Sequence, residues 1–313
     1  MNFKVIAGTV CAVGMFLFGI DLMGSSLEKC CSDKMKKILS ACTKTTFTGM
    51  LSGLIVTGII QSSSATTVMA VSFVDSGLIS LLQAIGIIMG ANIGTTVTSL
   101  LIAINFSSVA PLAVFIGTAM KMFSKKEKTQ YAGLVIAGFG FLFVAMSSMS
   151  EYLSFLKESQ STLNFLSAST GRIASIFIGF VITAIMQSSS ATVGVLQSAA
   201  ASGLVSTQNA IYILFGQNIG AVIPTLLSSV NTSKDAKRVA IVHLLFNTIG
   251  TLVFIVICEI TPYLVFLDKI ENPSLRVSVA HIVFNSLSTA LLLPFGKQLA
   301  KLSEIVIPER KRG

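Results

Sequence analysis

The sequence has few charged residues, and this scarcity excludes an ordinary soluble domain. Asp, Glu, Lys and Arg make up 11% of the 313 residues, hydrophobic side chains make up 53%, and Trp does not occur. About 25% charged residues would be expected in a soluble domain. Apolar runs of roughly 20 residues, long enough to cross a bilayer, recur along the chain instead. We therefore predict an all-α polytopic membrane protein that forms a single transmembrane domain over residues 1–313.

The cysteine pattern and the lack of a nucleophile motif argue against a metal site, a disulfide framework and a serine hydrolase. The five cysteines are odd in number and irregularly spaced, at Cys11, Cys30, Cys31, Cys42 and Cys258, which disfavours both a zinc site and a disulfide framework. No Gly-x-Ser-x-Gly nucleophile elbow occurs. The most conspicuous serines form two identical triplets, whereas a nucleophile would stand alone. We predict that the chain is not an enzyme and that it needs no cofactor.

Hydrophobic runs indicate seven full membrane spans and two further apolar segments. The full spans are expected at 5–24, 78–103, 107–123, 130–149, 204–230, 238–260 and 275–300. The first run is span-length and no convincing cleavage site follows it, so we interpret it as a retained helix rather than a signal peptide. The two further segments, 47–74 and 173–200, each contain the hexapeptide Gln-Ser-Ser-Ser-Ala-Thr.

The net charge of +9 can be explained by membrane topology without a nucleic-acid partner. Most of the 22 basic residues lie in 25–46, in 121–128, in 231–238 and in the C-terminal tail. Cytoplasmic loops of membrane proteins are enriched in Lys and Arg. These four segments share one side only if each hexapeptide segment returns to the side from which it enters, as a re-entrant hairpin. We therefore predict a multi-pass protein of the cell membrane with its N-terminus outside and its C-terminus in the cytoplasm.

The sequence is internally duplicated. A shift of 126 residues aligns 53–94 with 179–220 without a gap, and half of the aligned pairs are identical. An odd number of full crossings separates equivalent points, so the second copy is expected to be inverted relative to the first. Inverted repeats with interrupted helices are typical of secondary transporters, which bind their substrates near the membrane midplane. The predicted order is repeat one at about 7–105, a linking span at 107–123, repeat two at about 132–230, and final spans at 238–260 and 275–300.

Each hexapeptide falls at the turn of its predicted hairpin, inside the membrane, where polar side chains are unfavourable unless they have a function. Its hydroxyl and amide groups can donate hydrogen bonds, and the half-helix that follows presents free backbone N–H groups with partial positive charge. That combination suits an oxyanion such as phosphate. No Lys or Arg occurs in either hairpin core, so a bound anion would need dipoles, hydroxyls and a co-bound cation. The predicted anion-binding residues are Gln61, Ser62, Ser63, Ser64, Thr66, Gln187, Ser188, Ser189, Ser190 and Thr192.

A second repeated motif supplies candidate sodium ligands. Gly-Ala-Asn-Ile-Gly-Thr-Thr at 90–96 recurs as Gly-Gln-Asn-Ile-Gly at 216–220, and Pro224 follows the second copy. Gly and Pro weaken helices, so we expect both spans to unwind here and to free carbonyl groups for a cation. Gly-x-x-x-Gly is also a common packing surface between membrane helices, and this alternative stays open. The predicted sodium ligands are Ser63, Ser64, Asn92, Thr95, Ser189, Ser190 and Asn218.

Three titratable residues have no assigned role at this stage. His243 and His281 each begin a His-x-x-Phe-Asn motif on the last two spans, where His and Asn share a helix face. For both motifs we favour helix packing over ion coupling. Asp21 lies near the end of the first span, beside Gly24 and Ser25. An intramembrane carboxylate is a functional candidate, but this position favours a capping or interfacial role.

The doubled Gln-Ser-Ser-Ser-Ala-Thr, the Gly-Ala-Asn-Ile-Gly-Thr-Thr motif and the late His-x-x-Phe-Asn together resemble the type II sodium–phosphate cotransporter family over about 5–300. The resemblance implies sodium-coupled transport of inorganic phosphate by alternating access, with both ions held between the two hexapeptide hairpins. Thr95 and Thr96 have no hydroxyl counterparts at Ala221 and Val222, which leaves the number of sodium ions open.

Other interpretations remain open from sequence alone. The chain could carry a carboxylate or sulfate, export phosphate, or sense phosphate without moving it. Many bacterial relatives continue into a PhoU-like helical domain, whereas this sequence stops at Gly313, so we expect any such regulator to be a separate protein. The sequence leaves homo-oligomerisation open as well.

Overall fold

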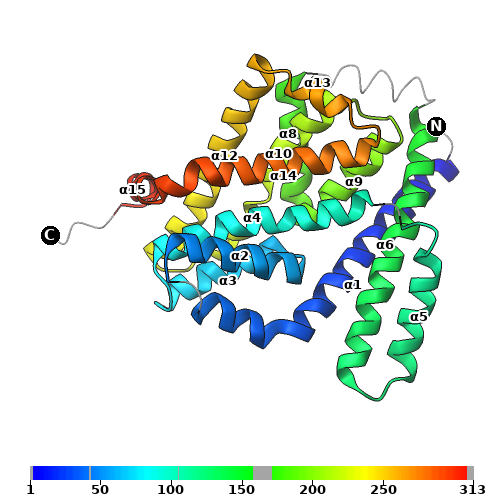
Figure 1. Ribbon diagram of the computed structural model, residues 1–313, viewed down its shortest axis with the longest axis horizontal. Helices are drawn as coiled ribbons and strands as arrows, with labels where there is room; N and C mark the ends of the chain where they lie inside the picture. The colour runs from blue at the N-terminus through cyan, green and yellow to red at the C-terminus, as the bar shows by residue number, and fades with distance from the viewer. Residues whose placement is uncertain (1–2, 42–43, 105, 158–170, 309–313) are drawn as a thin grey trace.

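The computed structural model describes residues 3–41, 44–104, 106–157 and 171–308, and every regular element in these ranges is a helix (Figure 1). The first half of the chain forms α1 (Phe3–Ala41), α2 (Thr46–Ile60), α3 (Ser63–Asp75), α4 (Leu81–Ala103), α5 (Ala110–Phe123) and α6 (Glu127–Lys157). The second half forms α8 (Arg172–Met186), α9 (Ser189–Ala201), α10 (Thr207–Gly220), α11 (Ile223–Ser228), α12 (Lys234–Ile260), α13 (Tyr263–Asp268), α14 (Pro273–Leu292), the 3₁₀ helix η1 (Leu293–Phe295) and α15 (Gly296–Val306). The all-α prediction is confirmed.

Six helical stretches are long and apolar enough to cross a membrane. They are Phe3–Cys31, Leu81–Ala103, Glu127–Phe155, Thr207–Ser228, Lys234–Ile260 and Pro273–Val306. Each contains most of a predicted span. The seventh predicted span, 107–123, corresponds to α5, whose 14 residues are fewer than the roughly 20 that a crossing needs. The exact number of crossings therefore stays a prediction.

The first helix is much longer than its predicted span. α1 runs unbroken for 39 residues, whereas the sequence predicted a span at 5–24 followed by a separate connector. It packs along α6, which also contacts α5 (Figure 1). A Cβ atom at Gly19 would touch the backbone of Leu142 in α6, and one at Gly138 would touch the backbone of Met23. Small residues thus allow the two backbones to approach closely.

The Gly-x-x-x-Gly motifs are packing surfaces. α2 lies along α4, and α8 lies along α10. A Cβ atom at Gly90 would collide with the carbonyl oxygen of Met50, and one at Gly216 would collide with that of Ile176. These glycines are therefore required by backbone-to-backbone contact, which is the alternative that the sequence left open.

The predicted unwinding at these motifs is wrong for the first repeat, because α4 is continuous from Leu81 to Ala103. In the second repeat the helix does stop, since α10 ends at Gly220 and α11 begins at Ile223. The difference has a local cause. Pro224 lies in the first turn of α11 and lacks the N–H that would continue the helical ladder. Thr98 occupies the equivalent position in the first repeat and supplies that donor.

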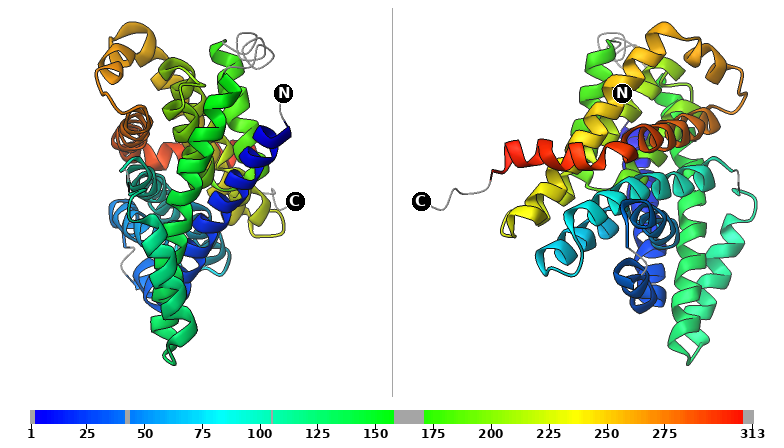
Figure 2. Two further views of the ribbon diagram at one scale, coloured as in Figure 1. Left: turned by 90° about the vertical axis from the view of Figure 1, so that its right-hand side faces the viewer. Right: turned by 60° about the vertical axis from the view of Figure 1, so that its left-hand side comes forward.

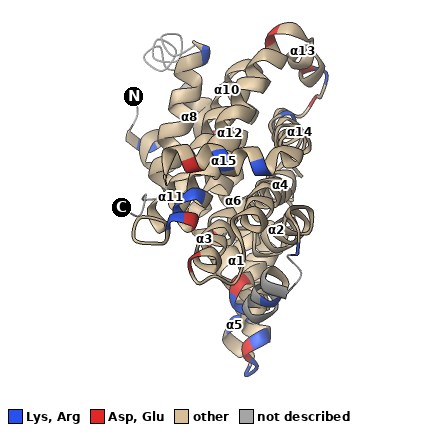
Figure 3. Cartoon of the chain, turned by 90° about the vertical axis from the view of Figure 1, so that its left-hand side faces the viewer, with Lys and Arg blue, Asp and Glu red and all other residues tan. Residues whose placement is uncertain are grey.

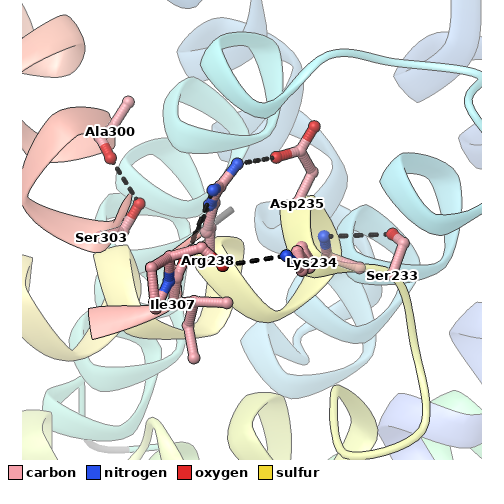
Figure 4. Close-up of polar contacts among 9 residues, drawn as sticks. Ser233, Lys234, Asp235, Arg238, Ala300, Ser303 and Ile307 are labelled. Carbon is pink, nitrogen blue, oxygen red and sulfur yellow. Dashed lines mark hydrogen bonds and ion pairs between the residues drawn. The ribbon is translucent and has the colours of Figure 1, made fainter. Parts of the chain in front are cut away.

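The chain termini lie at opposite ends of the molecule (Figure 1), and α15 packs against α12 and α4 (Figure 2). Lys and Arg gather around the free end of α5 and around α11 and α15 (Figure 3). Arg238, whose side chain is 5% exposed, fixes the C-terminal segment by donating two hydrogen bonds of 3.1 and 3.0 Å to the Ile307 carbonyl (Figure 4). Its guanidinium also pairs with Asp235 at 2.7 Å.

Candidate functional site

Each hexapeptide forms the turn between two short helices with the same backbone geometry. Gln61 follows α2 in the left-handed conformation, with φ 63°, and Gln187 follows α8 with φ 53°. Among the described residues, these are the only two non-glycine positions with positive φ. Ser62 and Ser188 then cap α3 and α9 in nearly identical extended conformations. The duplication in sequence is therefore a duplication of local structure.

The two turns meet each other. Ser63 Oγ lies 3.1 Å from Ser189 Oγ. Ser64 donates to the carbonyl of Gln187 at 3.4 Å, and Ser190 donates to the carbonyl of Gln61 at 3.5 Å. The contacts are reciprocal, because each serine uses the same group on the opposite turn. The predicted convergence of the two hexapeptides is thus found in the structure.

A pocket of about 410 Å³ lies beside this contact. Both turns and the middle of α1 form its wall, and none of the described lining residues is Lys or Arg. The first turns of α3 and α9 begin at Ser63 and Ser189, so two helix N-termini, with their partial positive charge, border the pocket. Its lining residues are Leu17, Ile20, Asp21, Gly24, Ser25, Glu28, Gln61, Ser62, Ser63, Ser64, Met186, Gln187, Ser188, Ser189, Ser190 and Ala191.

Two predicted anion-binding residues lie behind the turns rather than in the pocket wall. Thr66 is buried and accepts a hydrogen bond from Thr57 at 2.8 Å. Thr192 is buried and accepts one from Thr183 at 3.1 Å. In each repeat this pair ties the second helix to the first. The structure therefore gives both threonines a bracing position.

Gln61 and Gln187 have the same backbone conformation, but their side chains differ in burial and in hydrogen bonding. Gln61 is buried, and its Oε1 accepts a hydrogen bond from Thr98 at 2.7 Å while its Nε2 donates to the carbonyl of Gly58. Pro224 stands where a second Thr98 would be, and a proline side chain cannot donate. Gln187 is exposed to the pocket, and its side chain forms no hydrogen bond with any described residue. The repeats are thus asymmetric at one side chain.

The predicted asparagine sodium ligands lie apart from the pocket. Asn92 is buried in α4, and its Nδ2 donates to the carbonyl of Ile88 at 3.0 Å. Asn218 is buried in α10, donates to Leu214 at 2.8 Å and accepts from Asn285 at 3.4 Å. Thr95 bonds back to its own helix at 3.0 Å. None of the three predicted ligands Asn92, Thr95 and Asn218 is among the lining residues, so the structure brings together only the serine members of the predicted sodium set.

A chain of buried polar groups connects α3 to α11, α12 and α4. Sequence analysis singled out Asn92 and His243 but predicted none of the contacts between these helices. Thr67 of α3 lies 2.8 Å from the hydroxyl of Thr225 in α11. That hydroxyl is 3.1 Å from Nδ1 of His243, whose Nε2 lies 3.4 Å from Nδ2 of Asn92. Thr225 itself was marked in the sequence only by its position directly after the helix-breaking Pro224. His243 therefore links helices, in keeping with the packing role favoured from sequence.

Asp21 does not cap a helix, which was one of the two roles expected for it, and the interfacial role stays a prediction. The sequence favoured a helix cap or an interfacial position, but α1 continues for 20 residues beyond Asp21, through Gly24 and Ser25, to Ala41. Asp21 therefore lies in mid-helix and lines the pocket together with the two turns. Glu28 lines the same pocket. A capping role is excluded because the helix does not end there.

Comparison with known proteins finds one matching family and several relatives. The sequence matches the family described as Na+/Pi-cotransporter over residues 15–151 and 154–264. It is 28% identical to the uncharacterized protein YqeW of Bacillus subtilis, covering 94% of this chain and 96% of that protein. It is 25% identical over 95% of its length to YjbB of Salmonella typhimurium, whose name gives inorganic phosphate export as its proposed activity.

A third relative matches only part of the chain. The sheep sodium-dependent phosphate transport protein 2A is 37% identical over 94 residues, which are 29% of this chain and 14% of that protein. The chain spans about half of the length of YjbB. No solved structure matches the sequence. Since the family match covers both hexapeptides and most of the helices that surround them, the chain belongs to the Na+/Pi-cotransporter family.

Proposed function

We propose that this protein is a sodium-coupled secondary transporter of inorganic phosphate. The observation that carries the proposal is the meeting of the two hexapeptide turns beside a pocket of about 410 Å³. Serine hydroxyls and the N-termini of α3 and α9 offer hydrogen-bond donors and partial positive charge there. Membership of the Na+/Pi-cotransporter family supports phosphate as the anion.

The charge of the pocket supports cation coupling. Among the described lining residues, Asp21 and Glu28 alone are formally charged, and both are acidic. Two like charges 4 Å apart repel by about 4 kcal/mol under conditions typical of a protein surface. A phosphate ion entering this pocket alone would meet two carboxylates and no basic side chain among the described residues, whereas a co-bound sodium ion would offset the repulsion. Serine oxygens of both turns, at Ser63, Ser64 and Ser189, are suitable hard ligands for it.

The proposed transport cycle is alternating access of two inverted repeats. The α2–α3 pair opens toward the cytoplasm and the α8–α9 pair opens toward the outside, with phosphate and sodium held between the turns near the membrane midplane. The basic segments near α5, α11 and α15 (Figure 3) mark the cytoplasmic side by the positive-inside rule. By the same rule, the N-terminus would lie outside and the C-terminus in the cytoplasm.

Export is a second candidate, because YjbB is named for phosphate export. The same pocket and the same cycle would serve either direction, since the ion gradients decide the net flux of a secondary transporter. Influx and efflux differ in which face must hold sodium at high concentration. The direction is therefore a property to measure on the protein in a sealed membrane.

The test is flux of radiolabelled phosphate in proteoliposomes that contain the purified chain. We expect uptake driven by an inward sodium gradient, and little uptake when potassium or choline replaces sodium. Vesicles loaded with labelled phosphate and given the opposite gradient report export in the same preparation. A matched control is the Ser63→Ala, Ser189→Ala double variant, which keeps the turns but loses both facing hydroxyls. Equal phosphate flux in sodium and in choline would refute sodium coupling. Absence of phosphate flux in either direction would refute transport itself.

A further inference from the structure

Asp21 lines the pocket that the two hexapeptide turns form. α1 crosses both helical pairs at the level of their turns. The ring of Phe16 fills the space where Gly194 of α9 has no side chain, and Gly24 lies next to the Ile60 carbonyl at the end of α2. Asp21 stands between these two contacts and lines the same pocket as all six hexapeptide serines.

Asp21 has no partner of its own. No described residue gives its carboxylate a hydrogen bond or an ion pair, and its side chain is exposed to the pocket. An ionised carboxylate can only accept hydrogen bonds. The other polar groups in the wall are serines, two glutamines and Glu28, and the serine hydroxyls are already the natural donors to an anion. A free acceptor facing an anion site therefore needs a donor on the ligand.

We propose that Asp21 makes the site selective for oxyanions that carry a hydroxyl group. Its carboxylate accepts a hydrogen bond from the P–OH group of phosphate and disfavours oxyanions that have no such group. This inference rests on the proposed function. Both forms of phosphate present near neutral pH carry at least one hydroxyl group, as do the corresponding forms of arsenate. Sulfate has the same shape and charge range but is fully deprotonated. Asp21 thus separates phosphate and arsenate from sulfate, which was one of the alternatives open from sequence.

The size of the discrimination follows from what each anion leaves unpaired. With phosphate, the O–H···O⁻ hydrogen bond is charge-assisted and short. With sulfate, carboxylate and sulfate oxygens face each other with no proton between them, so repulsion remains. Sites built around a substrate hydroxyl reject analogues without it by factors of about 10⁴ to 10⁵ when fully enclosed. Because Asp21 is exposed to an open pocket, we expect a smaller factor, on the order of 100.

Glu28 provides a charge-matched control within the same helix. It lies seven residues after Asp21, about two helical turns and roughly 10 Å along the axis, and it lines the same pocket. Glu28→Gln therefore removes the same charge from the same wall. If selectivity came from the general negative field of the pocket, both variants would change it alike. If it comes from a hydrogen bond at one place, only the Asp21 variants change it.

The experiment measures competition against uptake of radiolabelled phosphate in proteoliposomes. For the unaltered protein and for Glu28→Gln, we expect arsenate to compete at concentrations similar to unlabelled phosphate and sulfate to need about 100-fold more. In Asp21→Asn the ratio of sulfate to phosphate inhibition constants should fall at least about tenfold, because an amide can donate to sulfate as well as accept from phosphate. Asp21→Glu, which keeps the acceptor, should retain selectivity against sulfate.

The outcomes separate this inference from the proposed function. Absence of phosphate flux in the unaltered protein would reject the proposed function itself. Flux with an unchanged sulfate-to-phosphate ratio in Asp21→Asn would overturn the inference alone, and so would a change confined to the sodium dependence, which would make Asp21 a cation ligand. If variants transport too slowly, stabilisation of the purified monodisperse protein by phosphate, arsenate and sulfate gives the same ratios without flux.

Discussion

The asymmetry between Gln61 and Gln187 leads to a quantitative prediction. Gln61→Ala removes the acceptor of the Thr98 hydroxyl, which is 1% exposed and donates over 2.7 Å. A buried donor left without a partner costs about 1–3 kcal/mol. Gln187→Ala removes a side chain without a hydrogen-bond partner, so its cost should lie within about 0.5 kcal/mol. Alanine retains a Cβ at both positions, so the strain of the left-handed backbone is the same before and after.

We therefore expect Gln61→Ala to lower the free energy of unfolding by about 1–2 kcal/mol more than Gln187→Ala does. For phosphate uptake the order should reverse, because the Gln187 amide is free to contact a ligand while that of Gln61 is occupied. Unfolding is followed by circular dichroism in mixed detergent micelles, since the chain has no Trp to report by fluorescence.

A double-mutant cycle with Thr98→Val isolates the hydrogen bond itself. Once Gln61 is alanine, replacing Thr98 should cost much less than it does alone, because the shared interaction is already lost. Additive effects of the two substitutions, or equal destabilisation by the two glutamine variants, would show that the turn is not locked in this way. The reasoning from the Thr98 and Pro224 difference would then be refuted.

Three further predictions concern packing and the polar links. Gly90→Ala should destabilise the protein by about 1–3 kcal/mol or more, because its Cβ would collide with a backbone carbonyl of α2, whereas Gly14→Ala, with nothing within 4 Å, should be neutral or mildly stabilising in thermal melts. Thr225→Val should lower stability by about 1–3 kcal/mol in denaturant titrations, since it interrupts the buried chain between α3 and the histidine of α12. Arg238→Ala should release the C-terminal segment, detected as faster tryptic cleavage near the C-terminus in intact folded protein, and unchanged cleavage would contradict the contacts in Figure 4.

The sequence predicted those parts of the site that are repeated. The two hexapeptides are identical over six residues, and a shared turn with a serine cap follows from local rules that apply to each copy by itself. Their convergence followed from the count of crossings between the copies. Gly-x-x-x-Gly at 90–94 was ambiguous because glycine both weakens a helix and permits close packing. Only the neighbouring α2 backbone decides between the two.

The parts that could not be predicted depend on contacts between segments distant in sequence. Thr98 is 37 residues from Gln61, and no local pattern indicates that its hydroxyl reaches that amide. Asp21 was expected to cap a helix or lie at the interface because Gly24 and Ser25 follow it, and Gly is a common signal for the end of a helix. In the folded protein α1 lies against α6 and both helical pairs, and tertiary packing outweighs the local signal. The second wall of the pocket was missed for that reason.

In the proposed cycle, the groups that bind substrate are also the groups that hold the two turns together. Ser64 and Ser190 each donate to a carbonyl of the opposite turn, and Ser63 meets Ser189 between them. Moving either helical pair away breaks all three contacts and leaves hydroxyls and carbonyls without partners, which is costly in a site away from water. Phosphate can satisfy the hydroxyls and sodium the carbonyls. A pair of ions therefore replaces what the moving turns lose, while either ion alone satisfies only half of it, and this gives coupling a structural cause.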